Sequence, residues 1–178
     1  SFSIEQPGKT SGIVFAGLPL GHEFTSFILA LLQVSGRPPK IDAALQKRIK
    51  AIDRPLYFET YVSLTCHNCR DVVQALNIMA VLNSNIRHKM IEGGMFKDEI
   101  DQKKIMGVPT VFLDNEEFAR GRQTIEQLLE KAAGPNSNEA CTEQEGFAAP
   151  GGGGGPAGGR AAVYAARKGI KTGMVAET

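Results

Sequence analysis

Cys66 and Cys69 lie where the sequence changes from a strand pattern to a helix pattern. Residues 57–62 alternate aromatic and β-branched side chains, which predicts a strand. From residue 66 to about residue 82 apolar side chains recur every three or four positions, which predicts an amphipathic helix. This C-x-x-C pair constrains the fold more than any other feature, because it requires a strand, a tight turn and a helix in that order.

The residues after this junction alternate between strand and helix patterns. The predicted elements are 86–91 (strand), 97–105 (helix), 110–113 (strand), 117–119 (strand) and 124–133 (helix). Asp114-Asn115 supplies the turn between the last two strands. Thr124, with Gln127 three residues later, predicts a capping box at the start of the last helix. The order is therefore βαβ, a helix, then ββα.

The cysteine pair has the arrangement of a redox motif. Disulfide exchange requires a thiolate, and a helix N-terminus stabilises one through its unpaired N–H groups and its dipole. We therefore predict that Cys66 is the nucleophile and Cys69 the resolving thiol, with His67 and Asn68 tuning the reduction potential. Arg70 adds positive charge nearby.

Two other interpretations of the pair stay open. It could be half of a zinc site, although the sequence has no second C-x-x-C or paired histidines, and His67, His88 and Cys141 lack ligand-like spacing. Alternatively, both cysteines are inert core residues, which the polar turn around them disfavours. We predict no metal site.

Pro109 directly precedes the predicted strand 110–113. A proline at that position is also compatible with an ordinary strand start. The order of elements, however, resembles the thioredoxin fold, in which a cis proline faces the C-x-x-C and leaves a backbone edge free for the partner. The resemblance implies a cis Val108–Pro109 bond opposite the cysteines.

An additional segment, residues 1–53, precedes this unit. Its predicted elements are 2–5 (strand), 12–16 (strand), 23–34 (helix) and 42–52 (a bridging helix). The predicted fold class is α/β, with a thioredoxin-like (glutaredoxin-type) fold over residues 54–134.

The C-terminal part has a different composition. Residues 135–150 are rich in Pro, Asn, Ser, Glu and Ala without apolar periodicity, which predicts a linker. Seven of the 20 glycines lie within 151–159, followed by an alanine-rich helix pattern and a strand pattern at 172–175. Residues 151–178 therefore form a separate segment.

Part of this segment matches a dinucleotide-binding fingerprint. Gly153, Gly155 and Gly158 have the required spacing, and Glu177 stands near the position of the acid that binds the ribose. This predicts a truncated Rossmann-type βαβ unit with these four residues as cofactor ligands. A flexible low-complexity linker is the alternative. The residues before Gly151 make a poor strand, which argues against FAD binding by this chain.

Composition excludes several classes of function. The formal net charge of +1 gives no reason to expect nucleic-acid binding. The longest apolar run, 27–32, is far shorter than the roughly 20 residues that span a bilayer, so we predict no membrane association. A C-x-x-C with one further cysteine, Cys141, predicts the cytoplasm rather than a disulfide-rich secreted protein. We expect Cys141 to be a free thiol without a role.

Several stretches together resemble the flavoprotein component of bacterial alkyl hydroperoxide reductase, which is the reductase of a two-cysteine peroxiredoxin. The stretches that carry the resemblance are 15–17, 19–26, 58–61, 66–69, 71–77, 106–109 and 155–158. They span nearly the whole chain. Arg70 departs from the family, which usually has proline after the second cysteine.

The resemblance implies more than the motifs do. The family has two tandem thioredoxin-like folds, a linker and a reductase part with FAD and NADH sites, and its electrons pass to the peroxiredoxin. Residues 1–53 would then be part of the first thioredoxin-like fold, and the chain a fragment of a parent that is a homodimer. The family's acid near the redox pair matches Glu23. The alternative for Glu23 is a helix-start acid on a solvated face.

We therefore predict thiol–disulfide electron transfer from an NADH- and FAD-dependent flavoprotein core to a two-cysteine peroxiredoxin. The first alternative is a stand-alone glutaredoxin-like oxidoreductase without flavin. The second is a non-catalytic docking module. Catalytic roles are predicted for Cys66, Cys69, Glu23 and Pro109.

Overall fold

The computed structural model describes residues 1–133, 149–152 and 172–175. The chain divides into two compact units, Ser1–Asn136 and Ser137–Thr178. Each unit is described by itself.

The first unit alternates strands and helices along the chain. Its strands are β1 (Phe2–Gln6), β2 (Lys9–Ala16), β3 (Leu56–Val62), β4 (Ile86–Glu92), β5 (Thr110–Leu113) and β6 (Glu116–Arg120). Its helices are the 3-10 turn η1 (Gly21–Glu23), α1 (Phe24–Val34), α2 (Ala43–Lys50), α3 (His67–Leu82), α4 (Lys97–Gln102) and α5 (Ile125–Ala133).

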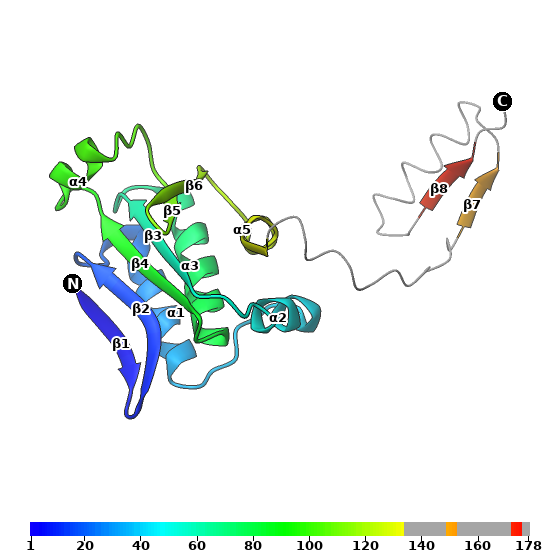
Figure 1. Cartoon of the computed structure of the whole chain (residues 1–178), viewed down its shortest axis with the longest axis horizontal. Helices are drawn as coiled ribbons and strands as arrows, with labels where there is room; N and C mark the ends of the chain where they lie inside the picture. The colour runs from blue at the N-terminus through cyan, green and yellow to red at the C-terminus, as the bar shows by residue number, and fades with distance from the viewer. Residues whose placement is uncertain (134–148, 153–171, 176–178) are drawn as a thin grey trace. The chain divides into compact units, whose positions relative to one another are not determined.

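The six strands form one sheet in the order β1-β2-β4-β3-β5-β6 (Figure 1). β2 and β3 each pair with β4 in parallel, whereas β1, β5 and β6 run antiparallel to their neighbours. β3-α3-β4 is the predicted βαβ unit, and β5-β6-α5 is the predicted ββα unit. Together they confirm the thioredoxin-like fold.

The N-terminal strands belong to the same sheet. β2 lies along β4, with Ala16 opposite Ile91, and β1 forms the outer edge. The β1-β2 hairpin leads into α1, so residues 1–34 have the same ββα order as the end of the unit. The division of residues 1–53 from 54–134 stays a prediction.

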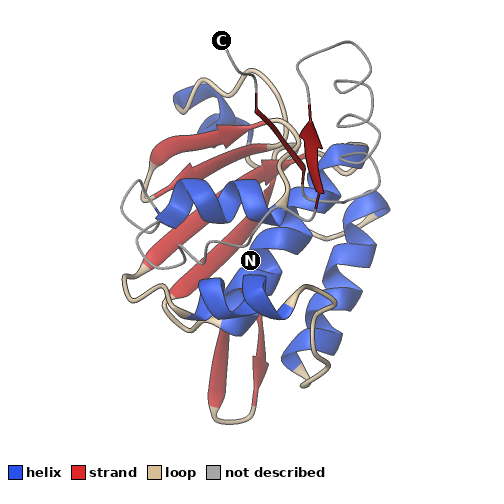
Figure 2. Cartoon of the chain, turned by 90° about the vertical axis from the view of Figure 1, so that its right-hand side faces the viewer, coloured by secondary structure: helices blue, strands red, loops and turns tan. Residues whose placement is uncertain are grey.

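Each face of the sheet has its own apolar cluster. On the face covered by α1, α2, α3 and α5, the largest fully buried side chains include Phe15, Phe58 and Met90 (Figure 2). On the other face, Tyr61, Ile91 and Phe112 pack with residues of α4 and its flanking loops. The alternation of side chains along each strand produces this division, and it directs α3 and the cysteines toward the larger cluster.

Local sequence signals explain most element ends. Asp114 and Asn115 have positive φ values of 51° and 71°, as the two-residue turn of a tight hairpin requires. The Thr124 N–H donates to Gln127 Oε1 at 2.9 Å, and the Gln127 N–H donates to Thr124 Oγ1 at 3.4 Å. The predicted hairpin turn and capping box are therefore confirmed.

α4 ends earlier than predicted. Lys104 adopts a left-handed conformation with φ of 52°, and the Ile105 N–H donates to the Ile100 carbonyl at 3.0 Å. These are the features of a Schellman motif, which usually contains glycine. Because a lysine occupies that position here, the apolar spacing alone extended the predicted helix to Ile105.

In the second unit the described residues form two parallel strands, β7 (Ala149–Gly152) and β8 (Thr172–Val175). β8 confirms the strand predicted at 172–175. β7 forms although it contains Pro150, which is tolerated because each strand of a two-stranded sheet is an edge strand. The Rossmann-type unit stays a prediction, since the residues between the two strands lie outside those described.

Candidate functional site

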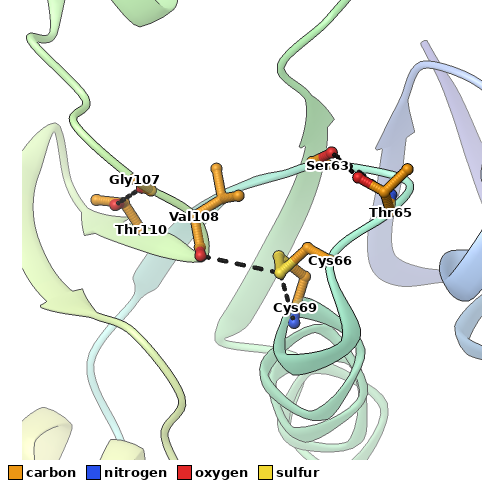
Figure 3. Close-up of a disulfide and its surroundings, with 7 residues drawn as sticks. All are labelled: Ser63, Thr65, Cys66, Cys69, Gly107, Val108 and Thr110. Atoms are coloured by element: carbon orange, nitrogen blue, oxygen red, sulfur yellow. Dashed lines mark hydrogen bonds between the residues drawn. A yellow bond between two sulfur atoms is a disulfide. The ribbon is translucent and has the colours of Figure 1, made fainter.

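The two cysteines form a disulfide at the start of α3 (Figure 3). Cys66 is the N-cap residue of that helix, and its Sγ accepts a hydrogen bond from the Cys69 N–H at 3.2 Å. The two Cα atoms lie 5.5 Å apart, which is a usual separation for a disulfide. The β3–α3 junction therefore holds the pair where the sequence predicts it.

The two cysteines differ in exposure. Cys66 is partly exposed, whereas Cys69 is fully buried against the larger apolar cluster. Only Cys66 can be reached by a sulfur atom of another protein, and its N-cap position places it in the field that stabilises a thiolate. This difference favours attack by Cys66 and resolution by Cys69.

The loop before β5 faces the disulfide. The Val108–Pro109 peptide bond is cis, which confirms that prediction. The Val108 carbonyl oxygen lies 3.8 Å from Cys66 Sγ (Figure 3). The Gly121 N–H donates to the Pro109 carbonyl at 2.8 Å, and the Thr110 hydroxyl donates to the Gly107 carbonyl at 2.6 Å. The loop is thus held on both sides of Pro109.

The short helix η1 is anchored to the turn that precedes Cys66. The His22 N–H donates to the Leu64 carbonyl at 3.2 Å. Gly21 has φ of 57°, and a Cβ atom there would lie 2.5 Å from the same oxygen. Position 21 therefore requires glycine. The ring centroids of His22 and His67 lie 3.9 Å apart, so η1 contacts the residue that follows Cys66.

Glu23 is fully buried beside this turn. Neither carboxylate oxygen has a hydrogen-bond partner among the described residues. Loss of hydration raises the pKa of Glu23; Ser26 and Arg70 lower it by smaller amounts, and Asp71 adds to the rise. The interpretation of Glu23 as an acid on a solvated face is therefore wrong, because η1 packs against α3 and turns this side chain inward.

Exposed apolar side chains gather at the same edge of the sheet. β2, β3 and β4 are parallel, so their C-terminal ends meet there, together with the loop before β5 (Figure 1). The residues are Leu18, Leu20, Met95 and Met106, all with large exposed side chains. We call these four residues the apolar rim. Clustered exposed apolar residues are typical of protein-binding surfaces.

Charged residues flank the start of α3. Arg122 donates to Asp71 Oδ2 at 2.8 Å, and Arg70 Nε lies 3.9 Å from Asp71 Oδ1. Both arginines are substantially exposed, so these pairs contribute little to stability. They leave Arg70 as a positive charge near Cys66, as predicted.

A second buried polar group lies at the middle of α3. His88 on β4 is fully buried, and its Nδ1 lies 2.7 Å from Asn77 Oδ1 while its Nε2 lies 2.9 Å from Thr60 Oγ1. Burial lowers the pKa of His88 to about 3, so the ring is neutral, donating to Asn77 and accepting from Thr60. Sequence reasoning missed this network, because its three members come from three elements.

The predicted nucleotide ligands Gly153, Gly155, Gly158 and Glu177 lie outside the described residues, as does Cys141. Their roles stay predictions.

Among residues 1–133, 149–152 and 172–175, no group of three or more His, Cys, Asp or Glu side chains is placed to hold a metal ion. Within the same ranges no helix has the length and apolar character needed to cross a membrane.

The chain has clear relatives among known proteins. The family model described as the thioredoxin domain matches residues 58–133. Over 99% of its length the chain is 55% identical to a Bacillus subtilis protein named NADH dehydrogenase. It is 52% identical, also over 99%, to the F subunit of alkyl hydroperoxide reductase from Pseudomonas aeruginosa. The chain spans about a third of the length of these curated relatives, 35% and 34% respectively.

A solved structure agrees with these matches. The NTD_N/C domain of the alkylhydroperoxide reductase AhpF from Enterococcus faecalis superposes with a TM-score of 0.67 at 36% identity, covering 71% of this chain and 60% of that one. The predicted resemblance is confirmed: nearly the whole chain is similar to one part of the alkyl hydroperoxide reductase flavoprotein AhpF.

Proposed function

We propose that this chain is a dithiol/disulfide carrier that passes electrons from a flavoprotein core to a two-cysteine peroxiredoxin. The observation that carries the proposal is the partly exposed Cys66, disulfide-bonded to buried Cys69 at a helix N-cap and facing cis Pro109. Its relatives among the AhpF components of alkyl hydroperoxide reductase support the choice of a peroxiredoxin as acceptor.

The proposed transfer has two steps. In the first, the Cys66 thiolate attacks one sulfur of the partner's disulfide; that S–S bond breaks, a mixed disulfide forms, and the leaving partner thiolate takes a proton. In the second, the Cys69 thiolate attacks Cys66 Sγ, which re-forms the intramolecular disulfide and releases the second partner thiolate. Two electrons and two protons move to the partner, and Cys66–Cys69 is oxidised.

Glu23 is the group we assign to proton exchange with these thiols. Its carboxyl is buried, its pKa is raised, and it adjoins the turn that carries Cys66. A carboxyl kept partly protonated near neutral pH can give a proton to a leaving thiolate and take one from an attacking thiol.

The apolar rim is the surface we assign to docking of the partner. Its side chains lie on loops at the edge where Cys66 and the Val108 carbonyl are found. Methionines adapt to differently shaped surfaces, which suits a carrier that must contact both an electron donor and an acceptor.

The proposal for the intact parent is an NADH- and FAD-dependent disulfide oxidoreductase. FAD there would accept hydride from NADH and reduce a second C-x-x-C, the dithiol that recharges Cys66–Cys69. The parent's homodimeric state and its cytoplasmic location, where thiols are kept reduced, belong to the same proposal.

Transfer to a peroxiredoxin tests the function. The purified chain is reduced with dithiothreitol, desalted and mixed with an oxidised two-cysteine peroxiredoxin, and the new peroxiredoxin thiols are counted. We expect stoichiometric transfer by the wild type and by Cys141→Ser. Undiminished transfer by Cys66→Ser would reject the assigned nucleophile.

Two outcomes distinguish the alternatives. Bound flavin, seen as absorbance near ~450 nm after purification, would reject the stand-alone glutaredoxin-like oxidoreductase. Peroxiredoxin binding with unchanged biological effect after loss of both cysteines would instead support a docking module.

A further inference from the structure

His22 brings a second aromatic ring to the redox motif. It lies on η1, whereas His67 occupies the position between the two cysteines that directly follows Cys66. The ring centroids are 3.9 Å apart and the ring planes are inclined by 41°. A residue from the N-terminal segment thus contacts the C-x-x-C motif of the thioredoxin-like unit.

The backbone around His22 makes this contact a fixed one. The His22 N–H is bonded to the Leu64 carbonyl, and Gly21 packs so closely on the same oxygen that no side chain fits there. On the inner side of the turn, Glu23 and Ser26 are fully buried. The η1 backbone is therefore held at both sides, and it presents the His22 ring in one place.

His67 has no comparable support of its own. It is exposed at the first position of α3, where a free side chain exchanges among several rotamers. The helix N–H groups at this position stabilise a thiolate at Cys66. An imidazole N–H held there adds one more donor, but only in a restricted ring orientation.

We propose that His22 is a positioning residue of the redox site, which holds the His67 ring in the orientation that stabilises the Cys66 thiolate. Only the dithiol form contains that thiolate. Any group that stabilises it therefore favours reduction of the disulfide, and loss of His22 makes the pair harder to reduce. The inference rests on the proposed redox cycling of Cys66 and Cys69, and it does not depend on which protein is the acceptor.

The test is the redox equilibrium of the chain with reduced and oxidised glutathione. Two reduced glutathione molecules supply two electrons and two protons, the Cys66–Cys69 bond breaks, and one oxidised glutathione forms. For His22→Ala we expect the equilibrium constant for reduction to fall by about 2- to 10-fold, the size of one aromatic pair contact. His22→Phe keeps a ring against His67 and should stay within about 2-fold of the wild type.

A double-mutant cycle shows whether His22 acts through His67. In the His67→Ala background, His22→Ala should cause no further change. An unchanged equilibrium constant for His22→Ala, or equal effects of His22→Ala with and without His67, would overturn the proposal.

Two controls separate positioning from loss of structure. Thr25→Ala, an exposed neighbour at the start of α1, should leave the equilibrium unchanged. If His22→Ala unfolds, His22→Gln removes the ring with a smaller change in volume and carries the same expectation. If transfer to the peroxiredoxin fails while the cycle shows coupling, the acceptor is wrong and the role of His22 stands.

Discussion

Two buried ionisable groups lie beside α3, and their surroundings differ. Glu23, at the end that carries the disulfide, has no hydrogen-bond partner for either carboxylate oxygen among the described residues. His88, at the middle of the helix, has both ring nitrogens bonded, to Asn77 and to Thr60. Buried polar groups are usually paired. The unpaired carboxyl is thus the one suited to exchanging protons, and the paired imidazole is a structural group.

The two groups also give stability opposite dependences on pH. Burial lowers the pKa of His88, so its contribution to stability is lost as pH falls from about 6.5 toward about 3. Burial raises the pKa of Glu23, so its contribution is present below the ordinary value of 4.5 and is lost as pH rises through the higher folded value. One end of α3 therefore resists acid, and the middle does not.

The largest expected effect sharpens the functional side of this comparison. Cys66→Ser removes the attacking thiolate, so we expect electron transfer to the peroxiredoxin to fall by roughly 1,000-fold or more. The far-UV circular dichroism spectrum should remain that of the wild type. Cys69→Ser should accumulate a mixed disulfide with the partner, visible on a non-reducing gel.

Acid titration tests the structural side. Between pH 6.5 and the His88 pKa of about 3, the unfolded chain binds a proton at His88 that the folded chain does not. His88 should therefore reduce the free energy of unfolding by about 1.4 kcal/mol for each pH unit lost. Urea denaturation at pH 7, 6, 5 and 4 measures this slope. A folded His88→Gln variant that keeps the wild-type slope would contradict the assignment.

Breaking the His88 network should cost stability without affecting the redox site. Asn77→Leu leaves the buried Nδ1–H of His88 without an acceptor, so we expect the free energy of unfolding to fall by about 1–3 kcal/mol. The redox equilibrium with glutathione should stay unchanged. Asn68→Ala, exposed on the same helix, is the matched control for stability and should change it by less than about 0.5 kcal/mol.

Replacing the unpaired carboxyl should have the converse effect. Glu23→Gln keeps the shape but removes the exchangeable proton, so we expect the transfer rate to fall by roughly 10- to 100-fold. Stability at pH 8 should stay equal or rise, because a buried charge is lost. Stopped-flow measurement of thiol exchange across pH 5–9 provides the check. An unchanged rate would leave Glu23 without a catalytic role.

The smallest effect concerns the surface charges. Arg122→Ala removes the 2.8 Å pair with Asp71, but both groups face solvent, so the free energy of unfolding should change by less than about 1 kcal/mol. Thermal unfolding at low and at high salt measures it. A loss above about 2 kcal/mol would mean that Arg122 does more than pair at the surface.

The accuracy of the sequence predictions depended on how local each signal is. The hairpin turn at Asp114-Asn115 and the capping box at Thr124 were predicted because their hydrogen bonds and backbone angles involve neighbouring residues. The end of α4 was wrong, since a lysine at Lys104 adopts a conformation that sequence reasoning assigns to glycine.

The sequence by itself determined the elements of the thioredoxin-like unit and the place of Cys66 and Cys69 between β3 and α3. Apolar periodicity and turn residues act within a few positions along the chain, so they can be read without the fold. Only the tertiary structure decided that Glu23 is buried without a partner, that His88 is bonded at both nitrogens, and that His22 meets His67. Each depends on elements brought together by burial of the apolar faces of the sheet and helices, a long-range effect that no local pattern encodes.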